Sequence, residues 1–79
     1  MRVYFSRGIP KRTMAKIQKL FEAELEKQKL IMSFLKHNSH SYEFWISSTT
    51  SEFFESGRVF TKTIRDTIAE IEKLLRENK

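Results

Sequence analysis

Hydrophobic residues recur at helical spacing in the first third of the chain. The positions that would share one helix face are Met14, Ile17, Leu20, Phe21 and Leu25. Pro10 stands where such a helix would begin, because proline lacks the backbone N–H that has no partner in a first turn. The pattern therefore predicts a helix over about 11–28.

The end of the chain shows the same spacing more clearly. Its apolar stripe consists of Ile64, Ile68, Ile71 and Leu75. Thr63 and Asp66 have the spacing of a capping box, in which a threonine side chain caps free N–H groups at a helix start. Arg76 and Lys79 lie near the C-terminal end, where the helix dipole favours cations. We therefore expect a second helix within residues 61–79.

Three short runs have the composition of β-strands. Residues 2–6 are rich in β-branched and aromatic side chains and precede a Gly-Ile-Pro segment that ends the strand. Residues 30–36 and 41–47 are similar runs, joined by a His-Asn-Ser-His segment in which Asn38 tolerates the positive φ of a tight turn. These two runs are predicted to form a hairpin.

Side-chain alternation assigns the faces of this hairpin. In its second strand, Tyr42, Phe44 and Ile46 share one face, while Glu43 and Trp45 share the other. In its first strand the pattern leaves two alternatives open. Either residues 32 and 34 or residues 31 and 35 face the core.

Residues 48–57 also admit two interpretations. Thr49 and Glu52 have capping-box spacing and Gly57 is a natural terminator, which favours a loop and a short helical turn. Alternatively, Phe53-Phe54 and Val59-Phe60 form a small hairpin around residues 55–58. The helical turn is our first expectation, and the hairpin remains open.

The order strand–helix–strand–strand–helix predicts an α+β fold in a single domain, residues 1–79. A strand–helix–strand unit makes its strands parallel, and the hairpin adds a third, antiparallel strand. Both helices have one apolar side, so they would cover the same face of a three-stranded sheet in a two-layer sandwich. The predicted core consists of Val3, Phe5, Ile17, Phe21, Leu25, Phe34, Phe44, Ile46, Ile64, Ile68, Ile71 and Leu75.

This arrangement leaves the other face of the sheet open. By alternation that face carries Arg2 and Tyr4 from the first strand, and Glu43 and Trp45 from the hairpin. Aromatic rings stack on unstacked bases while cations contact phosphates, so such a face suits single-stranded nucleic acid. A second copy of the chain, or the segment 48–60, would cover the same rings equally well.

Charge is unevenly distributed along the chain. The net charge is +5, yet residues 1–40 hold nine Lys and Arg against three acidic residues, a net +6. Residues 41–79 hold six basic and seven acidic residues, and Glu22 is the first acidic residue of the chain. A basic block of this kind indicates a polyanion partner.

The start of the first predicted helix is the most basic part of that block. It contains Arg7, Lys11, Arg12 and Lys16, with Lys19 following and no acid among them. The positive end of a helix dipole normally recruits acidic residues, whereas an anion bound there would meet free N–H groups and these side chains together. We therefore predict contacts to a phosphate backbone. A solvated basic surface is the competing interpretation.

Few residues in the sequence are candidates for catalysis or for metal binding. The chain has no cysteine, which excludes disulfides and thiolate sites. His37 and His40, with only Glu43 nearby as a third ligand, are too few for a structural zinc site, so we expect no metal and no cofactor. A small ribonuclease would need a base, an acid and a cation, for which His37, His40 and Arg58 are the candidates. The sequence favours binding without catalysis.

These features predict a small, non-enzymatic regulatory module that binds RNA or another single-stranded nucleic acid. The predicted contact residues are Arg2, Tyr4, Arg7, Lys11, Arg12, Lys16, Lys19 and Trp45. The alternative is a protein-binding regulator, such as an antitoxin or a phage-type inhibitor of a host enzyme that itself acts on RNA. A homodimer through the open sheet face is compatible with either interpretation.

The expected cellular location of the protein follows from two kinds of segment that the sequence does not contain. The longest apolar runs are Leu-Ile-Met and Phe-Trp-Ile, far shorter than a membrane span. Residues 1–8 have no apolar region of the kind found in signal peptides. We therefore expect a cytoplasmic protein that does not bind membranes.

Overall fold

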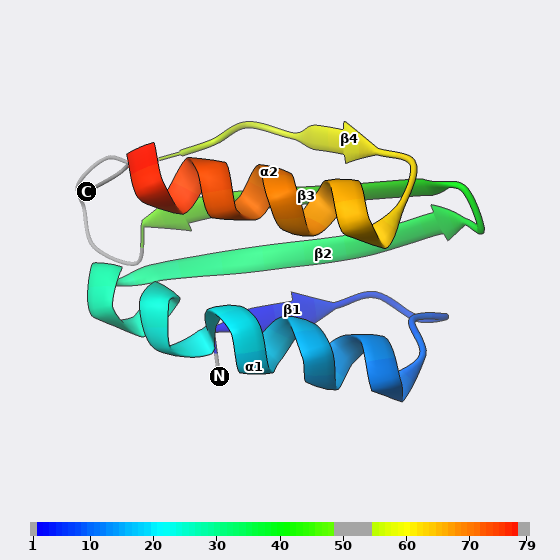
Figure 1. Ribbon diagram of the computed structural model, residues 1–79, viewed down its shortest axis with the longest axis horizontal. Coiled ribbons are helices and arrows are strands. Elements are labelled where there is room, and N and C mark those ends of the chain that lie inside the picture. The colour runs from blue at the N-terminus through cyan, green and yellow to red at the C-terminus, as the bar shows by residue number, and fades with distance from the viewer. Residues whose placement is uncertain (1, 49–54, 78–79) are drawn as a thin grey trace.

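The computed structural model describes residues 2–48 and 55–77. The elements there are β1 (Val3–Phe5), α1 (Lys11–Gln28), β2 (Leu30–Asn38), β3 (Ser41–Ser48), β4 (Val59–Thr61) and α2 (Ile64–Glu77). The strands form one sheet in the order β1-β2-β3-β4, with β1 parallel to β2 and the other neighbours antiparallel. Both helices lie on one face of this sheet (Figure 1), which confirms the α+β class.

The sheet has four strands, and the three-stranded prediction is wrong because β4 pairs with β3. Pairing begins upstream of β4: the Ser56 N–H donates to the Ile46 carbonyl, and the Ile46 N–H donates to Ser56 Oγ, both at 2.9 Å. Residues 55–57 therefore hold no helix, which overturns the expected helical turn there; residues 49–54 lie outside the described residues. The exposed edge of β3 needs a partner, and Val59 and Phe60 are strong strand formers.

α1 has the bounds that the sequence predicts. Pro10 is its N-terminal flanking residue, and its buried side chains recur at three- and four-residue intervals. They are Ile17, Phe21 and Leu25. At its other end Lys29 adopts the left-handed conformation, with φ 58°, and donates its N–H to the Glu26 carbonyl at 3.1 Å. The chain therefore turns directly from α1 into β2.

The register of β2 and β3 settles which hairpin residues face the helices. Met32 lies opposite Ile46 and Phe34 lies opposite Phe44, and all four side chains are fully buried. Because alternate side chains point to opposite faces, residues 31, 33 and 35 belong to the other face.

The core lies between the sheet and the two helices. Most predicted core residues are buried, and Phe5, Ile64 and Ile68 are partly buried against them. Ile9, Leu30 and Thr67 are also buried, although the pattern did not place them in the core. Tyr42 is buried on the face predicted for it, and Met32 is buried as one of the two alternatives left open. The Thr67 hydroxyl can be buried at little cost because it has hydrogen-bond partners there. It donates to the Thr63 carbonyl at 2.8 Å and shares a hydrogen bond with the Thr61 hydroxyl. This pair ties the start of α2 to β4.

The N-terminal cap of α2 is testable. Thr63 Oγ1 accepts the Asp66 N–H at 3.0 Å, as the capping-box spacing predicts. We expect Thr63→Ala to lower the free energy of unfolding by about 1 kcal/mol, the usual cost of losing a threonine cap. Urea denaturation followed by circular dichroism measures it. Thr13→Ala is the matched control, because the N-terminus of α1 has no side-chain cap. An equal effect of both changes would contradict the capping role of Thr63.

Candidate nucleic-acid interface

The predicted contact residues do not share one surface. Tyr4 and Trp45 lie on the side of the sheet that faces away from the helices, which we call the sheet face. Lys16 and Lys19 are exposed on α1, which packs on the opposite side of the sheet. The structure therefore does not bring these lysines together with Trp45.

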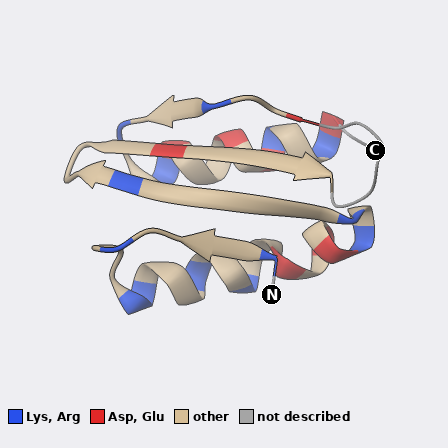
Figure 2. Ribbon diagram, turned by 180° about the vertical axis from the view of Figure 1, so that it is seen from behind, with Lys and Arg blue, Asp and Glu red and all other residues tan. Residues whose placement is uncertain are grey.

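The sheet face carries an aromatic residue from each of three strands. They are Tyr4 from β1, Trp45 from β3 and Phe60 from β4. The register places Tyr4, Ser33 and Trp45 in one row across the sheet, and Glu43 and Phe60 in the next row. Tyr4 is 53% exposed and Phe60 64% exposed. Figure 2 shows this face of the sheet with the helices behind it.

Phe60 was missing from the predicted site because a strand at Val59-Phe60 was only the second of the two interpretations of this segment. The alternation in Val59-Phe60-Thr61 was the available signal, since Val59 and Thr61 are opposite the buried-face residues Phe44 and Tyr42. Three residues are too few for alternation to outweigh the competing capping pattern. Only pairing with β3 places Phe60 on the sheet face.

Arg2 lies directly before β1 at the edge of the sheet. Its backbone N–H donates to Glu22 Oε2 at 2.8 Å, and its carbonyl accepts the Met32 N–H at 2.8 Å. These bonds tie the start of the chain to α1 and to β2. The backbone of Arg2 therefore has a structural role that does not depend on its side chain.

Glu43 belongs to the sheet face, as predicted, but it is only 3% exposed. Its Oε1 lies 2.7 Å from His37 Nε2, and its Oε2 lies 3.3 Å from Arg58 Nε. Oε2 accepts no hydrogen bond from the residues that the structure describes. Burying a carboxylate is costly unless partners compensate it. His37 and Arg58, on either side, supply that compensation.

Each of these two partners also lies against an aromatic ring. The guanidinium carbon of Arg58 lies 5.5 Å from the centroid of Trp45, a cation–π distance. The His37 ring stacks on Phe60 with 6.5 Å between centroids and 22° between planes. The Arg58 side chain is 70% exposed and that of His37 44% exposed. The buried carboxylate therefore holds two accessible polar side chains between two aromatic rings.

A small hollow opens beside Trp45. It has a volume of about 270 Å³ and is lined by Trp45, Glu55, Gly57 and Arg58. Gly57 has φ 71°, a conformation that favours glycine, and a Cβ there would meet no atom within 4 Å. The hollow is at the small end of the range for ligand pockets, which suits a single planar ring rather than a large ligand.

The second surface is one end of the molecule, which we call the basic end. The β1–α1 connection, the β2–β3 turn and the β4–α2 connection all lie there (Figure 1). Its basic residues are Arg7, Lys11, Arg12, Lys36, Lys62 and Arg65. Figure 2 shows basic residues at the start of α1 and acidic residues in its second half. The charge asymmetry in the sequence thus becomes an asymmetry along the helix.

The two helix N-termini at the basic end differ in how they are capped. α1 has no acidic residue in its first turn and no side-chain cap, whereas α2 has Asp66 in its first turn and the Thr63 cap. Gly8, with φ 86°, precedes α1, and a Cβ there would meet no atom within 4 Å. The start of α1 therefore combines uncapped N–H groups with exposed cations.

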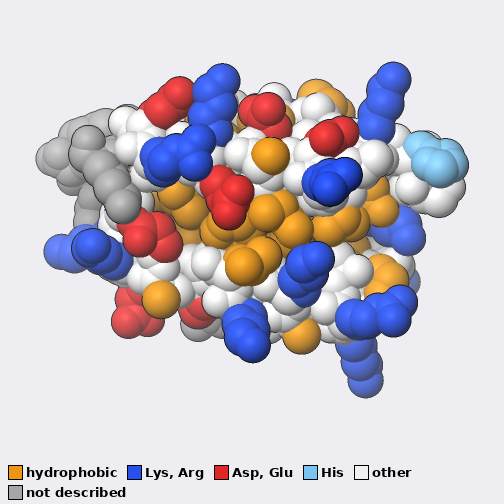
Figure 3. Space-filling view, in the orientation of Figure 1, with side chains coloured by type: hydrophobic (Ala, Val, Ile, Leu, Met, Phe, Trp, Pro, Cys, Tyr) orange, Lys and Arg blue, Asp and Glu red, His pale blue; other side chains and the backbone are white. Residues whose placement is uncertain are grey.

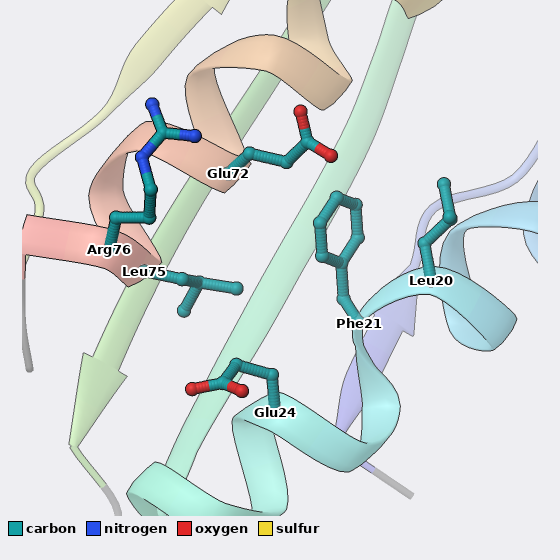
Figure 4. Close-up of a pocket in the computed structure, with 6 residues that line it drawn as sticks. All are labelled: Leu20, Phe21, Glu24, Glu72, Leu75 and Arg76. Atoms are coloured by element: carbon teal, nitrogen blue, oxygen red, sulfur yellow. The ribbon is translucent and has the colours of Figure 1, made fainter.

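A groove between α1 and α2 forms a third surface. It has a volume of about 310 Å³ and is lined by Leu20, Phe21, Glu24, Glu72, Leu75 and Arg76. Phe21 from α1 and Leu75 from α2 both extend into the space between the helices (Figure 4), and hydrophobic side chains follow the same line between them (Figure 3). Its two carboxylates outnumber its one arginine, so the groove suits an apolar protein side chain better than nucleic acid.

Comparison of the chain with protein-family models, with curated proteins and with solved structures finds no match. Within residues 2–48 and 55–77, no group of three or more His, Cys, Asp or Glu side chains is placed to hold a metal ion. In the same part of the chain, neither helix combines the length and the apolar character that crossing a bilayer demands. The chemistry of the sheet face, the basic end and the groove is therefore the basis for a proposed function.

The contact between Arg58 and Trp45 is testable in solution, because Trp45 is the one tryptophan of the chain. We expect Arg58→Ala to raise the quenching of Trp45 fluorescence by acrylamide, since the guanidinium covers part of the ring. Arg65→Ala, an exposed arginine on α2, is the matched control. Identical quenching constants in the wild type and Arg58→Ala would show that Arg58 does not cover the ring.

Proposed function

We propose that this protein binds RNA, or another single-stranded nucleic acid, through the sheet face. The observation that supports this most strongly is the set of three aromatic side chains, Tyr4, Trp45 and Phe60, on a face that neither helix covers. A base stacked on such a ring contributes about 1–3 kcal/mol, and stacking tolerates any sequence because every base has a π-face.

Cations near these rings support a nucleic acid rather than an uncharged ligand. Arg58 lies directly over Trp45. At the β1 edge of the face, Arg7 follows Tyr4 by three residues and leads into the start of α1 with Lys11 and Arg12. In this proposal bases occupy the sheet face, and the phosphate backbone that leaves it passes over the basic end.

Stacking on Trp45 is tested by two substitutions of that residue. We expect Trp45→Ala to weaken binding of a fluorescein-labelled single-stranded RNA by roughly five- to 150-fold, the equivalent of about 1–3 kcal/mol. Trp45→Phe keeps a ring and should retain most of the affinity. Fluorescence anisotropy measures both, and circular dichroism verifies the fold of each variant. Equal affinities for Trp45→Ala and the wild type would rule out stacking on this residue.

The contribution of the basic end is tested by reversing two charges. We expect Lys11→Glu/Arg12→Glu to weaken RNA binding and to flatten its salt dependence, because the slope of log K falls by about 0.7 for each phosphate that the variant no longer neutralises. Lys27→Glu/Lys73→Glu makes the same change in net charge away from the basic end and is the matched control. If both double variants weaken binding equally, only the net charge matters and no phosphate needs to bind at the start of α1.

A protein partner is the second candidate, and the groove between α1 and α2 is the observation that favours it. A regulator that binds a host enzyme would insert an apolar side chain between Phe21 and Leu75. A homodimer through the sheet face would instead bury Tyr4 and Trp45. Absence of binding to both single-stranded RNA and a DNA duplex would favour the protein partner. Sedimentation equilibrium of the free protein reports the dimer.

A further inference from the structure

We propose that the sheet face also cleaves RNA, with His37 as the general base and Arg58 as the cation that stabilises the reacting phosphate. The buried carboxylate of Glu43 positions both residues. This inference rests on the proposed RNA binding and goes beyond it, because it assigns a reaction to side chains that binding alone does not require.

The contact between Glu43 and His37 fixes which imidazole nitrogen can act as a base. A carboxylate that is ionised only accepts hydrogen bonds, so in the proposed state, with Glu43 ionised, the 2.7 Å contact from its Oε1 to His37 Nε2 requires the ring proton to be on Nε2. Nδ1 of the neutral ring then keeps its lone pair. The ring is accessible, whereas Glu43 is buried and touches no substrate. Glu43 is therefore a positioning residue, and His37 is the group that meets the substrate.

Arg58 is held by the same carboxylate through one of its nitrogens. Its Nε lies 3.3 Å from Glu43 Oε2, which leaves the two terminal amino groups for other acceptors. Paired guanidinium donors match the oxygens of a phosphate group. One buried carboxylate thus holds a base through one of its oxygens and a phosphate-binding cation through the other.

The surroundings of this pair fit a dinucleotide step. Trp45 and its hollow lie beside Arg58, and Phe60 stacks on His37. Bases on either side of a phosphate would stack on these two rings, which leaves the phosphate between them, beside Arg58 and His37. The substrate class is therefore single-stranded RNA whose bases are unpaired.

The proposed step is an attack by the 2′ oxygen of the RNA itself. The 2′-OH proton moves to His37 Nδ1, the 2′ oxygen forms a bond to phosphorus, and the bond from phosphorus to the 5′ oxygen breaks. The departing 5′ oxygen takes a proton from water, and the His37 imidazolium then returns its proton to the hydroxide that this leaves. Glu43 stabilises the imidazolium that forms, and Arg58 stabilises the charge on the phosphoryl oxygens. The products are a 2′,3′-cyclic phosphate and a 5′-hydroxyl, and DNA is not a substrate.

The structure also separates the two histidines that the sequence analysis considered together. The backbone N–H of His40 donates to Asn38 Oδ1 at 2.8 Å within the β2–β3 turn, whereas the ring contact to Glu43 belongs to His37. Burying the Glu43 carboxylate costs desolvation free energy, which a neutral polar side chain at this position would not cost. A buried charge that orients a histidine and an arginine on an open face is therefore more typical of a functional site than of a purely structural one. His40 accordingly provides the control for His37.

The experiment measures cleavage of a single-stranded RNA that carries a fluorophore at one end and a quencher at the other. We expect cleavage by the wild type and by His40→Gln. His37→Gln should lower the rate by about 100-fold or more, and Arg58→Gln by a similar factor. Glu43→Gln should lower the rate with little loss of RNA affinity, as expected for a positioning residue. All variants are purified in parallel, because a contaminating nuclease would cleave equally in each.

Binding is measured separately, by anisotropy, with an RNA of the same sequence that carries 2′-O-methyl groups. This analogue has no 2′ proton to give, so it reports affinity without cleavage. If the wild type binds the analogue but does not cleave RNA, or if His37→Gln cleaves as fast as the wild type, the catalytic inference is overturned and the binding proposal stands. Products without a 2′,3′-cyclic phosphate would also overturn it. If the wild type binds neither RNA, both proposals are wrong.

Discussion

The register of the β2–β3 hairpin is the constraint on which the other features depend. Met32 opposite Ile46 and Phe34 opposite Phe44 place large apolar side chains under the helices. Because side chains alternate strictly along a strand, the same register places Ser33, Glu43 and Trp45 on the opposite face. A slip of one residue would exchange the two sets, burying polar groups and exposing the core. Packing on one side therefore determines what the other side presents.

The sheet face has a buried carboxylate among its aromatic rings. Glu43 is buried between His37 and Arg58, and those residues lie against Phe60 and Trp45. The buried charge, the accessible donors and the stacking surfaces form one connected arrangement built from β2, β3 and the start of β4. The basic end lies at the limits of the same strands, which is why the binding proposal takes the phosphate backbone from the sheet face to that end.

Local signals in the sequence were sufficient for α1, for the hairpin and for α2. Pro10 and the apolar spacing define α1 within a few residues, and Thr63 caps α2 as its spacing indicates. A strand at Val59-Phe60 was only an alternative, and its pairing with β3 was not predicted, because that pairing depends on the free edge of β3 and not on the three residues of β4. The choice between Met32 and Ile31 for the core was likewise undecidable locally, since both faces of that strand carry apolar side chains.

The sequence by itself determined the α+β class, the amphipathic helices and a basic start to α1, because each depends on neighbours within a few residues. Only the tertiary structure decided that Lys16 and Trp45 lie on opposite sides of the sheet and that Phe60 joins the aromatic set. Tertiary structure also brought His37, Glu43 and Arg58 together. The predicted hairpin already placed Glu43 near His37, whereas Arg58 joins them only because the chain before β4 runs beside β3, and that pairing depends on residues far from Arg58 in the sequence.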